Sequence, residues 1–152
     1  MRIIVSACLL GINCKYNGGN NDCPALKELL DRPAPDGTRW EPVPVCPEQL
    51  GGLPTPRKPA EIVNGSVCTE DGHSVDAAFR LGAEKALAIA MESGAKTAIL
   101  KAKSPSCGPN GIYDGTFSHT LIPGEGIFAA LLRENGFEVL SESKSSRFPV
   151  SD

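Results

Sequence analysis

Short apolar stretches that alternate with helical patterns are the feature that most constrains the fold of this chain. Runs of β-branched and other apolar residues predict strands over residues 3–7, 40–45, 97–100 and 137–141. Helical patterns lie between them, over residues 24–30, 74–92 and 124–135. Strands that alternate with helices form parallel sheets with helices packed on them. We therefore expect an α/β protein with a single-domain, three-layer, Rossmann-like fold and a mainly parallel sheet.

Local signals refine this outline. The clearest helix, 74–92, carries an apolar stripe from Val75 to Met91, and Gly94 is placed to end it. Asp22 is a candidate N-cap for the helix that starts at Pro24. Finally, the residue pair at 64–65, Asn-Gly, predicts the turn of a small hairpin over residues 61–68.

The size and composition are those of one ordinary globular domain, which we expect to span residues 1–152. Hydrophobic residues make up 41% and charged residues 22% of the chain, and the apolar runs fall short of the ~20 residues that cross a bilayer. The first eight residues resemble a buried strand more than a signal peptide, so we expect a cytoplasmic protein. The net charge of -3 argues against a broad nucleic-acid surface and favours a small-molecule partner.

Three of the six cysteines follow predicted strands directly: Cys8, Cys46 and Cys107. Because parallel strands place their carboxyl ends at one edge of the sheet, these thiols are expected to converge there. Thiolates are the usual ligands of iron-sulfur clusters, and three of them leave one iron of a cubane cluster open. The alternative for each cysteine is simple burial in the core.

The other three cysteines are harder to assign. Cys14 shares a loop with Cys8 and is a candidate fourth ligand, whereas Cys23 and Cys68 have the local setting of packing residues. No C-x-x-C pair is present to indicate a zinc or ferredoxin site.

Polar residues beside these cysteines add acid-base groups. Glu48 follows Cys46 by two positions and can act as a general acid or base in a partly desolvated pocket; otherwise it is an exposed charge at a helix start. Ser104 precedes Cys107 by three positions and can bind substrate or orient water; otherwise it caps a turn. His73 and His119 are most simply interpreted as solvated loop residues.

Five segments together resemble the thiouracil desulfidase family, long listed as a domain of unknown function. They are Cys-Leu-Leu-Gly at 8–11, Lys-Tyr-Asn-Gly at 15–18, Cys-Pro-Glu at 46–48, Gly-Gly-Leu-Pro-Thr-Pro-Arg at 51–57 and Lys-Ser-Pro-Ser-Cys-Gly at 103–108. The resemblance spans most of the chain. It implies an enzyme that removes sulfur from thiolated uracil without net redox change, using a 4Fe-4S cluster held by three cysteines.

Carried over position by position, the resemblance assigns roles to single residues. The cluster ligands are Cys8, Cys46 and Cys107, and the catalytic pair is Glu48 and Ser104. Substrate contacts are assigned to Asn17, where relatives often carry aspartate, and to Lys103 as an extra hydrogen-bond donor. The expected substrate is a small thiolated pyrimidine, with a thiolated tRNA less favoured.

Two other functions fit the same cysteines. One is an iron-sulfur sensor or carrier in which Cys14 supplies a fourth ligand and no substrate enters. The other is a metal-free enzyme in which Cys107 is a nucleophile, its pKa lowered by a helix N-terminus.

Overall fold

The computed structural model describes residues 1–143, and a parallel sheet forms the centre of this part of the chain. Its four strands stand in the order β2-β1-β5-β8, and every neighbouring pair is parallel. They are β1 (Arg2–Ser6), β2 (Glu41–Val45), β5 (Thr97–Leu100) and β8 (Glu138–Ser141). These bounds agree with the predicted strands to within one residue at every end, and the parallel α/β architecture is confirmed.

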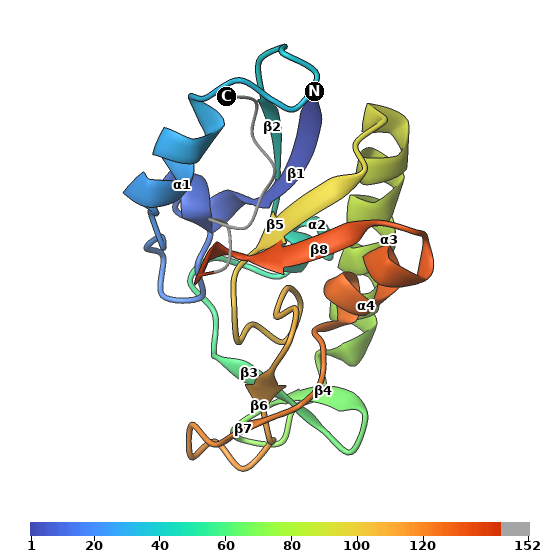
Figure 1. The fold of residues 1–152 in the computed structure, drawn as a ribbon. Helices are drawn as coiled ribbons and strands as arrows, with labels where there is room; N and C mark the ends of the chain where they lie inside the picture. Colours follow the sequence, from blue (N-terminus) through green and yellow to red (C-terminus); the bar gives the residue numbers. More distant parts are fainter. Residues whose placement is uncertain (144–152) are drawn as a thin grey trace.

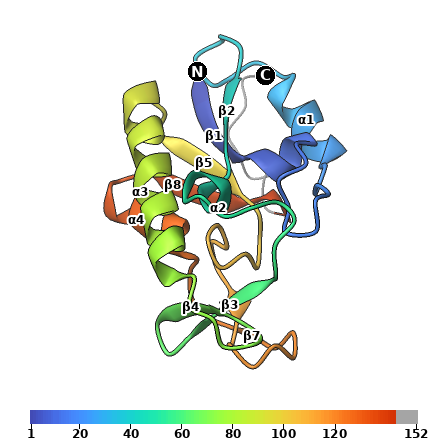
Figure 2. The ribbon, with the colours of Figure 1, turned by 180° about the vertical axis from the view of Figure 1, so that it is seen from behind.

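Helices cover both faces of this sheet (Figures 1 and 2). Helix α1 (Pro24–Leu30) packs on one face, where Ile3 and Val5 of β1 meet Leu26. Helices α3 (Asp76–Ser93) and α4 (Ile127–Glu134) pack on the other, around Ile4 and Phe128. Successive residues of β1 therefore enter opposite cores, which is why its three central residues, Ile3 to Val5, are all apolar.

Strand β2 tolerates Pro42 and Pro44 because it lies at the edge of the sheet and pairs with β1 alone. Helix α2 (Pro47–Leu50) begins two residues after β2 ends, so Cys46 is the single residue between them. The short 3-10 helix η1 (Ala7–Leu10) follows β1 in the same way and contains Cys8.

Helix α2 lies very close to α3 because both carry a glycine at the contact. A Cβ atom on Gly82 of α3 would overlap the carbonyl oxygen of Pro47, and one on Gly51, just after α2, would overlap the carbonyl oxygen of Ala78. This close approach fixes α2, and with it Cys46 and Glu48, against the body of the molecule.

Two hairpins lie together beyond the sheet (Figures 1 and 2). The first, β3 (Ala60–Val63) and β4 (Ser66–Thr69), turns at residues 64–65 as predicted, and both turn residues have positive φ. The second, β6 (Ile112–Tyr113) and β7 (Leu121–Ile122), was not predicted, because two-residue strands leave no periodic signal.

Two local predictions were wrong. Asp22 does not cap α1: Cys23 occupies the N-cap position without a side-chain bond, and the Asp22 carboxylate pairs with Lys27 instead. Met91, assigned to the buried stripe of α3, is 56% exposed, because small residues such as Ala86 and Ala90 form the packed face.

Within residues 1–143, none of the helices combines the length and apolar composition that crossing a membrane requires. The cytoplasmic location stays a prediction.

Candidate functional site

A cavity of about 400 Å³ lies where the loops after β1, β2 and β5 meet the two hairpins. It has the volume typical of small-molecule sites. Four of the six cysteines line it: Cys8, Cys14, Cys46 and Cys107. We call these four residues the cysteine set. The structure therefore brings the three predicted ligands together at the carboxyl ends of their strands, and adds Cys14 to them.

Cys14 is the cysteine that links the others. It is 2% exposed, and its thiol is hydrogen-bonded to the sulfurs of both Cys8 and Cys46. These bonds, ahead of all other causes, lower the pKa of Cys8 and of Cys46 to about 7, and the same bonds raise the pKa of Cys14 far above its usual range. A further bond from Asn21 Nδ2 reaches the Cys8 sulfur at 3.4 Å. The pKa of Cys8 and that of Cys46 are thus both lowered toward neutral pH, and the Cys46 thiol also donates to the Cys14 carbonyl oxygen at 3.8 Å.

Cys107 has a different environment. It is buried in the turn between β5 and β6, and burial raises the pKa of its thiol to about 12. The turn is not a helix N-terminus: α4 starts twenty residues later, at Ile127. The hypothesis of a metal-free nucleophile needs a helix start and a lowered pKa at Cys107, whereas Cys107 lies in a turn and burial raises its pKa.

Glu48 is held by hydrogen bonds to both of its carboxylate oxygens. Arg57 Nε donates to Oε1 at 3.1 Å, and Ser106 Oγ donates to Oε2 at 2.9 Å. The Arg57 side chain is 7% exposed and also donates to the Cys14 carbonyl oxygen at 2.8 Å. A single buried guanidinium thus connects the carboxylate to the loop that carries Cys14.

Ser104 completes this arrangement without contacting Glu48 directly. Its Oγ accepts bonds from the backbone N–H groups of Ser106 and Cys107, at 3.2 and 3.1 Å, as a turn-capping serine does. It also lies 3.0 Å from Ser106 Oγ. The chain Ser104, Ser106, Glu48, Arg57 is therefore continuous, and we call these four residues the carboxylate network.

No three His, Cys, Asp or Glu side chains of residues 1–143 approach closely enough to hold one metal ion. A multi-iron cluster is larger than an ion, and its thiolate ligands surround it instead of meeting at one point. The four thiols of the cysteine set are donors of the kind that such clusters use and that Ca²⁺ and Mg²⁺ do not.

Comparison with known proteins places the chain. The family model described as 2-thiouracil desulfurase matches residues 3–144. The chain belongs to the 2-thiouracil desulfurase family. A Bacillus subtilis (strain 168) protein, the uncharacterized protein YbbK, is 42% identical over 152 residues, which cover 93% of this chain and 96% of the relative.

A solved structure is also similar to this member of the desulfurase family. It is described as the 4Fe-4S-dependent thiouracil desulfidase TudS, and it superposes with a TM-score of 0.85 at 42% identity. The match covers 97% of this chain and 94% of that one. The single-domain α/β architecture is thus shared along nearly the whole length of both proteins.

Of the residues predicted to contact substrate in this desulfurase-family member, one reaches the cavity. Lys103 lines it and holds a left-handed backbone with φ 70°, a conformation that costs energy for a residue with a side chain. Asn17 is exposed and is not among the lining residues; its Oδ1 accepts a bond from the Gly19 N–H at 2.9 Å.

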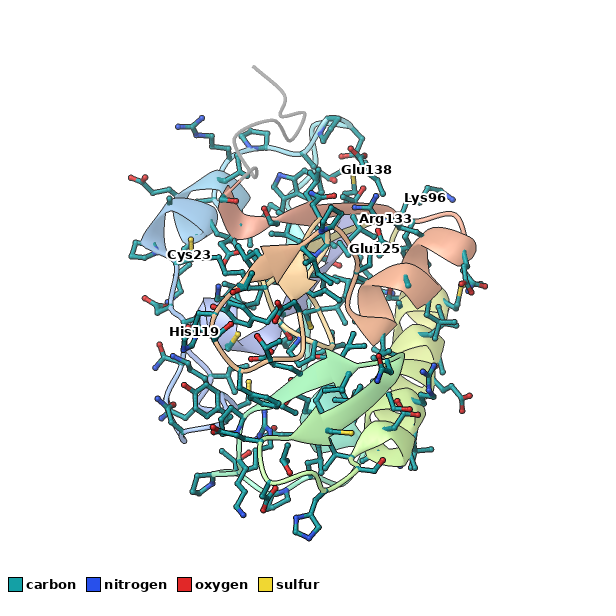
Figure 3. The ribbon with its side chains drawn as sticks, turned by 90° about the horizontal axis from the view of Figure 1, so that it is seen from below. Cys23, Lys96, His119, Glu125, Arg133 and Glu138 are labelled. Atoms are coloured by element: carbon teal, nitrogen blue, oxygen red, sulfur yellow. The ribbon has the colours of Figure 1, made fainter. Side chains whose placement is uncertain are left out.

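Of the two histidines, one borders the cavity and the other does not. His73 is an exposed surface residue, as predicted, beside Asp71 at 3.0 Å. His119 is exposed too, but it borders the cavity, where its ring stands edge-on to Tyr113 with centroids 5.2 Å apart. Cys23 and Cys68, predicted to be packing residues, are half-buried and do not line the cavity (Figure 3 labels Cys23 and His119).

Arg57 and Ser106 were not singled out from the sequence, although both stand in the segments that carry the family resemblance. Arg57 lies nine positions after Glu48, and Ser106 lies 58 positions after it. Spacing along the chain gives no sign of either contact. The arginine stands in a glycine- and proline-rich loop, and the structure buries it there. A buried charge needs a partner, but the sequence does not show the burial.

Proposed function

We propose that this protein removes sulfur from thiolated pyrimidines, converting thiouracil and water to uracil and hydrosulfide without net redox change. The observation that carries the proposal is the meeting of the cysteine set with the Glu48 carboxylate in one cavity, in a chain of the 2-thiouracil desulfurase family. The net charge of -3 favours a small pyrimidine over a thiolated nucleic acid.

The cofactor of this proposal is a 4Fe-4S cluster held by Cys8, Cys46 and Cys107. The residues fit it, because all three thiols line one cavity and the pKa of Cys8 and of Cys46 is lowered to about 7. When bound, a cluster with three protein ligands supplies an open iron that acts as a Lewis acid toward the sulfur of the substrate.

Glu48 is the proposed acid-base residue. Its carboxylate accepts a proton from the water that adds to the thiolated ring carbon, the carbon-sulfur bond breaks, and sulfur leaves as hydrosulfide. Arg57 and Ser106 support this role because they fix both oxygens of the carboxylate. Water supplies the oxygen of uracil and the hydrogen of hydrosulfide, and its second proton passes through Glu48 to the solvent.

Ser104 is proposed to act through Ser106. Because its Oγ accepts two backbone N–H bonds, its own proton is directed to other partners, of which Ser106 Oγ at 3.0 Å is the nearest recorded. Ser104 thus positions Ser106, and through it Glu48, or a water beside them. Lys103 is proposed as an additional donor to the pyrimidine at the cavity wall.

Anaerobic reconstitution followed by a thiouracil turnover assay tests the function, with uracil and sulfide measured together. Cys107→Ala is expected to lose the visible absorbance of the cluster and the activity together. Cys68→Ala is the matched control, because Cys68 is half-buried on β4 and does not line the cavity; it should keep both. Full desulfuration by a cluster-free Cys107→Ala protein would rule out the mechanism.

The position of Cys14 favours a second candidate, an iron-sulfur sensor or carrier with four cysteine ligands. Its thiol contacts two of the proposed ligands in the same cavity. Mössbauer spectra of the anaerobic protein with and without thiouracil separate the two functions. A change at one unique iron supports the enzyme, whereas four equivalent irons that do not respond support the sensor.

A further inference from the structure

A second carboxylate, Glu61 of β3, lines the same cavity and is 7% exposed. It takes part in none of the ion pairs found in residues 1–143. A buried carboxylate without a cation needs several hydrogen-bond donors to remain charged. The donors around Glu61 therefore decide what this group does.

One oxygen of Glu61 has its donors. Oε1 accepts the backbone N–H of Gly115 at 3.0 Å and that of Phe117 at 3.2 Å, which ties β3 to the loop between β6 and β7. This loop carries His119, whose ring stands against Tyr113 at the cavity wall. Glu61 thus holds an aromatic wall of the cavity in place.

The other oxygen is left for a ligand. Oε2 accepts no hydrogen bond from the described part of the chain. It is also not one of the sealed interior atoms without a partner there, so it reaches open space. Glu61 borders a narrow hollow beside Ile112 and the cavity, and of the two the cavity has room for a ligand. A carboxylate oxygen accepts and does not donate, so its ligand must present an N–H or O–H group.

We propose that Glu61 Oε2 accepts a hydrogen bond from a ring N–H of the pyrimidine and thereby selects substrates that keep this donor. The inference rests on the proposed function and extends it to substrate choice. The two cavity carboxylates then have separate tasks: Glu48 is engaged by Arg57 and Ser106, whereas Glu61 recognises the ring. A pyrimidine whose contacted nitrogen carries a methyl group or a sugar lacks the donor and is disfavoured.

Glu61→Gln tests this proposal directly, because it keeps the shape of the side chain but replaces the acceptor that faces the cavity with a donor. The amide oxygen must face the Gly115 and Phe117 N–H groups, so the amide nitrogen, a donor, takes the place of Oε2. Two donors then oppose each other when substrate binds. We expect KM for 2-thiouracil to rise at least ~10-fold with kcat changed less than ~3-fold, the pattern of a lost binding contact.

The assay compares wild type, Glu61→Gln and the control Glu125→Gln on 2-thiouracil and its N1-methyl and N3-methyl derivatives. Glu125 pairs with Arg133 at 2.6 Å, away from His119 (Figure 3), so its variant should match wild type. For the derivative that is methylated at the contacted nitrogen, the KM of Glu61→Gln should equal the KM of wild type. An equal loss on all three compounds, or no loss on 2-thiouracil, overturns the inference.

Calorimetric titration with uracil gives an answer that does not depend on turnover. Glu61→Gln should bind uracil at least ~10-fold more weakly than wild type. If wild type lacks desulfidase activity, the proposed function fails, and the titration alone tests the role of Glu61. Weaker uracil binding by the variant than by wild type then supports that role. Equal binding by the two proteins, or no binding by either, overturns it. If Glu61→Gln does not fold, equal KM values of wild type for 2-thiouracil and both derivatives overturn it.

Discussion

The cysteine set and the carboxylate network line one cavity but differ in how they are held. The thiols of Cys8 and Cys46 each interact with the Cys14 thiol, which lowers the pKa of both. Glu48, by contrast, is fixed by groups outside the cysteine set, Arg57 and Ser106. The two sets meet at two points: the Cys14 carbonyl oxygen accepts a bond from Arg57, and Ser106 Oγ donates to the Cys107 sulfur at 3.6 Å.

This difference suggests that the two sets of residues have separate functions. Thiols that ionise easily suit the binding of iron, and a carboxylate with both oxygens fixed suits proton transfer at a stated position. A variant of the carboxylate network should then lose turnover and keep iron, whereas a variant of the three proposed ligands should lose both. The following predictions test this separation.

Glu48→Gln should have the largest effect within the carboxylate network. Loss of an acid-base group lowers rates by about 100- to 10,000-fold, and we expect kcat to fall within this range. Iron and sulfide content should equal those of wild type, because the thiols are untouched. Chemical iron analysis and turnover of the same preparation check both statements; a drop in iron that parallels the drop in kcat would contradict the separation.

Arg57→Gln should have an intermediate effect. It removes the bonds to Glu48 and to the Cys14 carbonyl oxygen, and a carboxylate misplaced by about 1 Å is expected to cost up to ~100-fold in kcat. Arg57→Lys should recover only part of the rate, because an ammonium group does not reproduce the guanidinium fork.

The matched control for Arg57 is Arg80→Gln. Arg80 forms an exposed i,i+4 pair with Asp76 on α3, and pairs of this kind contribute ~0.5 kcal/mol or less. Its turnover should equal that of wild type. Full activity of both glutamine variants would show that Arg57 does not position Glu48.

Cys14→Ala should have the smallest effect on turnover and a clear one on thiol reactivity. Without the Cys14 hydrogen bonds, the pKa of Cys8 and of Cys46 rises from about 7 toward the ordinary value of 9.0. A raised pKa means fewer thiolates at neutral pH, so alkylation of both residues in cluster-free protein at pH 7.5 should slow by about tenfold. Peptide mass spectrometry after timed alkylation measures this.

Cys107 provides the internal reference for that experiment. Its pKa of about 12 is set first by burial and not by Cys14, so its slow alkylation should not change. If Cys14→Ala leaves the alkylation rates of Cys8 and Cys46 unaltered, the thiols of the cysteine set are independent of one another.

Periodicity and turn chemistry were enough to predict most of the fold. The strands around Ile4 and Ile99, the long helix that ends before Gly94, and the hairpin at residues 64–65 all appear where the sequence places them. Each of these signals is local, because it lies within the residues that form the element. The convergence of the three cysteines followed as well, since parallel strands end at one edge.

The errors concern which alternative a local pattern takes in the folded chain. Met91 fits the apolar stripe of its helix but is exposed, because the approach of α2 at Gly82 decides which face packs. Cys107 lies in a turn instead of at a helix start, because the backbone of residues 104–107 closes on Ser104. The packing of α3 is not visible in a window of a few residues, whereas the turn at Ser104 is local and was the alternative role given to that serine.

The sequence by itself determined the parallel α/β sheet and the edge at which three thiols gather, because strand order along the chain and strand polarity are local properties. Only the tertiary structure decided which groups act on each other across the cavity. The Cys14 thiol interacts with those of Cys8 and Cys46, and Glu48 meets a serine 58 positions away. Hydrogen bonds depend on distances of a few ångströms in space, and these arise only when the loops after separate strands have packed together.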